Sequence, residues 1–134
     1  MNSLLVDTSV WINFFNNSKN TKEVELLEYF LNEDDNICIC PIIYQEILQG
    51  IRNDNIFLEI RSYLLNFTML SNNILEASNL AIDIYRLSRK KGKTIRKSKD
   101  CLIAAYSILN NLPLLQIDRD FNHISQFTKL RLIT

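Results

Sequence analysis

The run Leu4-Leu5-Val6-Asp7-Thr8-Ser9 places a carboxylate directly after a short apolar segment. An uninterrupted apolar run is typical of a strand that is buried on both faces, as in a parallel sheet. Asp7 follows where such a strand would end, and Thr8 or Ser9 can cap a helix that begins there. An acid that only solubilises a surface has polar neighbours. The run therefore predicts a functional site at the edge of a sheet.

Three further acids end or interrupt apolar segments in the same way, and they are Glu46, Asp100 and Asp118. Asp118 closes the predicted strand 114–117, Asp100 falls in the first turn of a predicted helix, and Glu46 lies one turn into another. Sites in open parallel sheets form at the carboxyl ends of the strands, and a helix N-terminus favours negative charge. We therefore expect all four acids to face one end of the sheet.

Apolar periodicity predicts strands that alternate with helices along the whole chain. The predicted strands are 4–6, 36–40, 67–70, 114–117 and 130–133. The predicted helices are one carrying residues 10–15, one through 24–31 opened by a capping box of Asn20 and Glu23, then 41–52, 56–65, 74–87, one after an N-cap at Ser98 that carries 101–109, and 121–125. This alternation implies an α/β protein whose parallel sheet is covered on both faces, folded as one domain over 1–134.

Composition narrows the class of protein. Hydrophobic residues at 47% and charged residues at 22% are ordinary for a soluble domain, and only 2 Gly and 2 Pro argue against flexible linkers. The apolar runs are too short to span a bilayer and the start lacks a basic signal-peptide segment, so we expect a cytoplasmic protein with no membrane contact. Three cysteines and a single histidine make a zinc site improbable and indicate buried free thiols.

Basic residues are concentrated just before Asp100. Eight of the fifteen basic residues lie between positions 86 and 99, with no acid among them: Arg86, Arg89, Lys90, Lys91, Lys93, Arg96, Lys97 and Lys99. A solvated helix end and loop would also carry such charge. Because the run leads straight into an acid of the predicted site, a polyanion held beside the carboxylates explains it better.

Four converging carboxylates need a counter-charge. Two of them about 5 Å apart repel by about 3 kcal/mol at an effective dielectric constant of 20. The counter-charge is either a nearby Lys or Arg or a divalent cation, and ligands that are all oxygen select Mg²⁺ or Mn²⁺. Such an ion keeps waters, one of which can become the nucleophile. Acids beside a basic surface thus predict metal-dependent hydrolysis of a nucleic acid.

Each acid also has a plainer explanation when taken alone. These are a helix cap for Asp7, an exposed helix position for Glu46, a cap or a pair with Arg96 or Lys97 for Asp100, and a turn with Asp120 for Asp118. Their joint occurrence favours a shared site. The aromatic residues Trp11, Phe14 and Phe15 can stack on bases, although core or dimer contacts are the more common role of aromatics on such a helix.

Four segments carry a family resemblance, in order along nearly the whole chain: 5–12, 46–50, 94–105 and 118–121. With these segments the sequence resembles the PIN-domain ribonucleases, and specifically the VapC-type toxins of type II toxin–antitoxin modules. The resemblance implies a PIN-like three-layer α/β/α sandwich with a mainly parallel sheet. It also implies endonucleolytic cleavage of RNA with Mg²⁺ or Mn²⁺, a homodimer, and a cognate antitoxin that inhibits the enzyme and can join it in a higher assembly.

The resemblance also implies roles for individual residues. Asp7, Glu46, Asp100 and Asp118 would be the catalytic and metal-binding quartet, with Asp7 and Asp100 as principal ligands. Supporting roles would fall to Thr8, Ser9, Ser98 and Asp120, and RNA contacts to Lys93, Arg96, Lys97 and Lys99. Asp120 could share the fourth acidic role with Asp118. Gln116 stands where family members often carry Thr, His or another small polar residue.

Two other enzyme classes that use similar sheets do not fit the motifs of this sequence. A haloacid-dehalogenase-type phosphatase needs a second Asp two residues after its nucleophile, where Ser9 stands. A response-regulator receiver needs a phosphoacceptor Asp after the third strand, where 71–73 holds Ser and Asn. The remaining alternative is a catalytically inactive PIN-like scaffold that binds RNA or a partner. Loss of an acid would be its signature, and all four acids are present.

Overall fold

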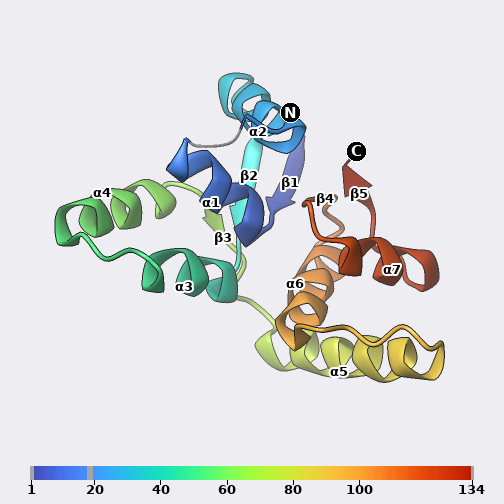
Figure 1. Ribbon diagram of the computed structural model, residues 1–134. Coiled ribbons are helices and arrows are strands. Elements are labelled where there is room, and N and C mark those ends of the chain that lie inside the picture. Colours follow the sequence, from blue (N-terminus) through green and yellow to red (C-terminus); the bar gives the residue numbers. More distant parts are fainter. Residues whose placement is uncertain (1, 18–19, 134) are drawn as a thin grey trace.

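A computed structural model describes residues 2–17 and 20–133 (Figure 1). Its sheet has five strands in the order β3-β2-β1-β4-β5, and every pairing is parallel. The mainly parallel sheet expected from the sequence is therefore confirmed. The strands are β1 Ser3–Val6, β2 Asn36–Ile39, β3 Thr68–Met69, β4 Leu114–Leu115 and β5 Leu132–Ile133.

The described residues form seven helices in two groups: α1 Thr8–Asn16, α2 Lys22–Asn32, α3 Pro41–Gln49, α4 Asp54–Leu64, α5 Ile74–Lys90, α6 Ser98–Leu109 and α7 Arg119–Phe127. Within α1–α4, α1 contacts α2 and α3, and α3 contacts α4; α5, α6 and α7 all contact one another. In Figure 1 the first group lies toward the left and top and the second toward the lower right. The strand order explains the division. The chain moves from β1 outward to β3, then crosses back to β4 and moves on to β5 in the opposite direction. Because crossovers between parallel strands keep one hand, a reversal of direction places the helices on the opposite face of the sheet. The three-layer α/β/α arrangement follows.

β1 occupies the centre of the sheet. Leu5 is in register with Cys38 of β2 on one side and with Leu114 of β4 on the other. The chain leaves β1 toward α1 and leaves β4 toward α7, which belong to opposite helix groups. This is the switch point at which open parallel sheets form their ligand sites. Asp7 and Asp118 follow these two strands.

Apolar burial holds this frame together. Leu4, Leu5 and Val6 are almost completely shielded from solvent, as the uninterrupted run predicted. The three cysteines are buried and unpaired, which agrees with the interpretation as structural thiols. No helix in the ranges 2–17 and 20–133 is long and apolar enough to cross a membrane.

The caps of three helices differ from the predictions. Asp7, and not Thr8 or Ser9, caps α1, because its Oδ2 accepts the Ser9 N–H at 3.3 Å. Thr21 replaces Asn20 as the cap of α2 by accepting the Val24 N–H at 3.2 Å. The predicted N-cap at position 98 is wrong, since α6 starts with that serine and no side-chain bond closes its first turn.

Several element boundaries also differ. β4 ends at Leu115, so Asp118 does not close a strand; it caps α7 through the N–H of Asp120, 3.0 Å from its Oδ1. β5 begins only at Leu132, α3 ends at Gln49, and α7 is longer than predicted. Before β5 the strand prediction was too long because Leu130 is buried in a loop, and burial in loops gives the same sequence pattern as burial in strands.

The cap assignment at α2 gives a direct stability test. Thr21→Ala is expected to lower the free energy of unfolding by about 1 kcal/mol, because it removes the acceptor for the Val24 amide. Asn20→Ala, the matched control, should change it by less than about 0.5 kcal/mol. Urea unfolding followed by circular dichroism measures both. A larger effect at Asn20 would restore the capping box predicted from the sequence.

Candidate active site

A pocket of about 140 Å³ lies where β1 ends, and all four predicted acids line it. They come from the turn after β1, from α3, from the first turn of α6 and from the cap of α7. The full lining is Asp7, Thr8, Ser9, Ile12, Glu46, Lys97, Lys99, Asp100 and Asp118. Ile12 was missed in the sequence; its position one helical turn after Thr8 was the signal that could have found it. A larger groove of about 460 Å³ along α1, α3 and α4 shares Ile12 and Glu46 with this pocket.

Asp7 and Asp100 are the buried acids of the pocket, 5% and 4% exposed. Burial raises the pKa of Asp7, although the Ser9 hydroxyl donates to it at 2.6 Å and opposes the shift. Burial, together with the charges of Asp7 and Asp118, raises the pKa of Asp100 to about 7. The Oδ2 atom of Asp100 has no hydrogen-bond partner among the described residues. A buried carboxylate oxygen without a donor is a natural ligand for a cation.

Two hydroxyl groups orient the acids of the pocket. Thr8 Oγ1 donates to Glu46 Oε1 at 2.7 Å, which ties α1 to α3 across the site. Ser9 donates to Asp7 through both its hydroxyl and its backbone N–H. The structure therefore places Thr8 and Ser9 where supporting residues were expected.

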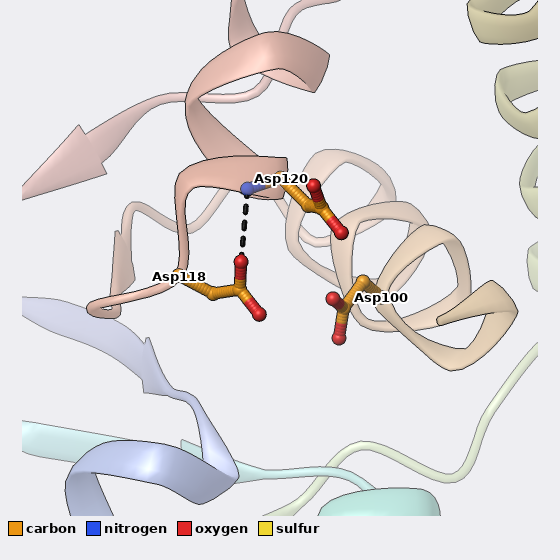
Figure 2. Close-up of side chains that lie close together, drawn as sticks. All are labelled: Asp100, Asp118 and Asp120. Carbon is orange, nitrogen blue, oxygen red and sulfur yellow. Dashed lines mark hydrogen bonds between the residues drawn. The ribbon is translucent and has the colours of Figure 1, made fainter. Parts of the chain in front are cut away.

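Asp118 and Asp120 lie beside Asp100 at the opening of α7. Figure 2 shows their carboxylates and that of Asp100 converging, and oxygen atoms of the three lie within 4.8 Å of one another. Asp118 lines the pocket, whereas the buried Asp120 does not. Of the two candidates for the fourth acid, Asp118 is therefore the one that faces the other three. Gln116 lies outside the pocket and donates to Asn122 at 3.3 Å.

The basic residues divide into those at the pocket and those away from it. Lys99 pairs with Glu46, and Lys97 lies 3.7 Å from Asp118 Oδ2. Arg96 pairs with Asp118 at 3.4 Å and with Asp120 at 3.5 Å. Lys93 is exposed and does not line the pocket. The predicted supporting residue Ser98 lines a different cavity, with residues of α5, because the first turn of α6 points it away from the acids.

The donor set suits a hard divalent cation. The pocket lining contains carboxylate and hydroxyl oxygens and no histidine or cysteine. Oxygen ligands of this kind favour Mg²⁺ or Mn²⁺ over zinc or copper. The unpartnered oxygen of Asp100 fits the same group, since a cation would satisfy it.

The family model of the PIN domain matches residues 4–126. The chain belongs to the PIN-domain family. The protein named VapC ribonuclease Mb1587, from Mycobacterium bovis, is 31% identical over 128 residues, which cover 96% of each chain. This PIN domain is therefore of the VapC type, as the sequence motifs indicated.

Solved structures agree on the fold of this PIN domain. VapBC-1 from nontypeable Haemophilus influenzae contains a chain with a TM-score of 0.75 at 19% identity, with 98% of this chain and 96% of that chain covered. A toxin-antitoxin complex from Klebsiella pneumoniae gives a TM-score of 0.68 at 20% identity, over 88% and 89% of the two chains. At these identities the likeness shows a shared fold.

Proposed function

We propose that this protein is a metal-dependent endoribonuclease and the toxin of a type II toxin–antitoxin module. One observation carries the proposal: four acids from separate parts of the chain line one pocket at the switch point of the sheet. Its relative is named a VapC ribonuclease, which supports RNA as the substrate. The residues proposed for catalysis and metal binding are Asp7, Glu46, Asp100 and Asp118.

In this proposal the acids hold the metal ion, and two neighbouring hydroxyl groups orient them. Asp7 and Asp100 are the principal ligands, because they are buried and their ionised forms lack sufficient counter-charge. A bound Mg²⁺ or Mn²⁺ would supply that charge, lower the pKa of an attacking water and stabilise charge on the phosphate. Ser9 fixes the orientation of Asp7, and Thr8 that of Glu46. Because burial and the nearby acids raise the pKa of Asp100 to about 7, part of this carboxyl is protonated near neutral pH, and metal binding there should release protons.

The basic residues at the rim would hold the RNA backbone. Lys97, Lys99 and Arg96 lie at the acids and are partly or largely exposed, so phosphates can reach them. Lys93, which is exposed and lies outside the pocket lining, is the fourth residue proposed to contact RNA. We further propose one PIN domain over 1–134 that forms a homodimer and binds a cognate antitoxin; the toxin-antitoxin complex with the same fold supports that partner.

An inactive RNA- or partner-binding scaffold is the second candidate. A scaffold without catalysis has no need of acids such as Asp7 and Asp100, because buried carboxylates without sufficient counter-charge destabilise the fold. This chain keeps all four around one pocket. Cleavage is therefore the better-supported function.

The test is incubation of the purified protein, freed of any partner, with total cellular RNA. We expect discrete fragments with Mg²⁺ or Mn²⁺, none with chelator, and none from Asp7→Asn, which controls for contaminating nucleases. Mapping the fragment ends would identify the substrate. Metal binding by a folded protein that cuts no RNA in any of these pools would favour the scaffold instead.

A further inference from the structure

Arg96 holds two of the acids at the site at once. Its Nη2 lies 3.4 Å from Asp118 Oδ1 and its Nε lies 3.5 Å from Asp120 Oδ2. Its backbone N–H also donates to Asp120 Oδ2 at 3.3 Å. The preceding residue, Ile95, is buried in the core, so the segment that carries the arginine is anchored next to the contact. One guanidinium group therefore occupies the place between these two carboxylates.

The position between Asp118 and Asp120 adjoins the acidic pocket, because Asp118 lines the pocket and Asp120 does not. Oxygens of Asp100, Asp118 and Asp120 converge within 4.8 Å, an arrangement that could hold a second ion beside the first (Figure 2). Two-metal nucleases place their ions about 3.5–4 Å apart. Here, however, the carboxylate that a second ion would need, that of Asp120, is already paired with Arg96.

Charge balance points the same way. Five carboxylates belong to the cluster, the four acids of the pocket together with Asp120, and three cationic side chains pair with them. When all five carboxylates are ionised, as a bound cation favours, two negative charges are left, and one divalent ion neutralises them. A second ion would give the cluster a net positive charge before any substrate arrived.

The outer face of the guanidinium is free for an anion. Arginine has five N–H donors, and the contacts to Asp118 and Asp120 engage Nε and Nη2 on one edge. The Arg96 side chain is 57% exposed, and no contact among the described residues engages its remaining donors. That fork matches two oxygens of a phosphate group.

We propose that Arg96 is the second cation of this centre. The pocket takes a single divalent ion, and the guanidinium, fixed by Asp118 and Asp120, fills the neighbouring position and contacts the scissile phosphate of the RNA. This inference rests on the proposed nuclease function for its phosphate contact, but not for its metal stoichiometry. It also gives Asp120 a role: it is a positioning residue for Arg96 and not a metal ligand.

Counting bound Mn²⁺ by calorimetric titration of the purified, chelator-treated chain tests the stoichiometry. We expect one ion for the wild type and two for Arg96→Met, because Asp118 and Asp120 are then free to bind one. Lys97→Met is the matched control: it removes the same charge from Asp118 but leaves the guanidinium in place, so one ion should bind. Two ions in the wild type, or one in Arg96→Met, would overturn the proposal.

RNA cleavage by the same variants tests the phosphate contact. At a Mn²⁺ concentration that saturates the wild type, Arg96→Met should cleave about 100-fold more slowly. Its rate should also rise more steeply with Mn²⁺, since a second ion must bind. An unchanged rate with an unchanged Mn²⁺ dependence contradicts the contact.

The two proposals can fail separately. A wild type that cleaves RNA with two bound ions keeps the nuclease and rejects the role of Arg96. Stoichiometries of one and two without any RNA cleavage reject the nuclease and keep Arg96 as the cation that excludes a second ion.

Discussion

Asp100→Asn is expected to reduce metal-dependent RNA cleavage by at least about 100-fold. Substitution of residues that only support a metal ligand costs up to about 100-fold, and Asp100 is proposed as a ligand itself. Asp100 Oδ2 is buried without a partner and faces the pocket shared with the other acids. An amide keeps the shape of the side chain but offers a cation no negative charge. Initial rates on a mapped RNA substrate, with Mg²⁺ held at a fixed concentration, measure the loss.

The same substitution should stabilise the metal-free protein. Burial and the nearby acids raise the pKa of Asp100 to about 7, above the ordinary value of 3.8. An acid with a raised pKa favours the folded state while it is protonated, and this contribution is lost as the pH rises from about 4 through 7. At pH 8 the wild type carries the full penalty of a buried charge, and Asn carries none. We expect a gain on the order of 1–3 kcal/mol at pH 8 and little difference at pH 4.

Urea unfolding in the presence of chelator, at both pH values, measures this gain. Asp83→Asn, which alters an exposed carboxylate on α5, is the control and should leave the free energy of unfolding nearly unchanged. A variant that loses both activity and stability at pH 8 would show that Asp100 contributes to the fold and not only to the site. A loss of RNA cleavage together with a gain in the free energy of unfolding would show that Asp100 serves the active site and destabilises the fold.

Trp11→Ala should produce the largest loss of stability, about 3–5 kcal/mol. The ring is fully buried and lies among four aromatic rings, with centroids 5.3–6.4 Å away. Phe15 stacks on it with an interplanar angle of 16°. Its burial confirms the core interpretation, while Phe14 and Phe15 pack against the core with partial exposure.

Unfolding of this variant must be followed by circular dichroism, because Trp11 is the only tryptophan. Trp11→Phe is the matched control. It keeps an aromatic ring and removes the indole N–H, which has no partner among the described residues, so its cost should stay below about 1.5 kcal/mol. A loss of RNA binding in Trp11→Phe without a loss of stability would instead favour the stacking of bases on this ring.

Local patterns were sufficient for much of the fold. The apolar run 4–6 predicted the buried central strand, and the alternation of strands and helices predicted the parallel sheet. The four acids were identified because each stands against apolar sequence, and the pocket contains all four. Such patterns work because burial and helix capping depend mainly on residues close together in the chain.

The errors have a common physical origin. Thr21 and Asn20 are both good caps, and only the path of the chain into α2 decides between them. Residues 116–117 continue the predicted strand 114–117 in sequence, yet no neighbouring strand pairs with them. Ser98 stands two residues before Asp100 in the sequence, but the first turn of α6 directs the two side chains to different cavities.

The sequence by itself determined the alternation of strands and helices along the chain, the four acids and the basic run beside them. The tertiary structure alone decided which cation meets which acid: Lys99 pairs with Glu46, and Arg96 bridges Asp118 and Asp120. The raised pKa of Asp100 likewise arises only in the folded protein. The physical reason is that these interactions join residues brought together by the crossovers of the sheet, and both burial and charge–charge distance are set by that assembly.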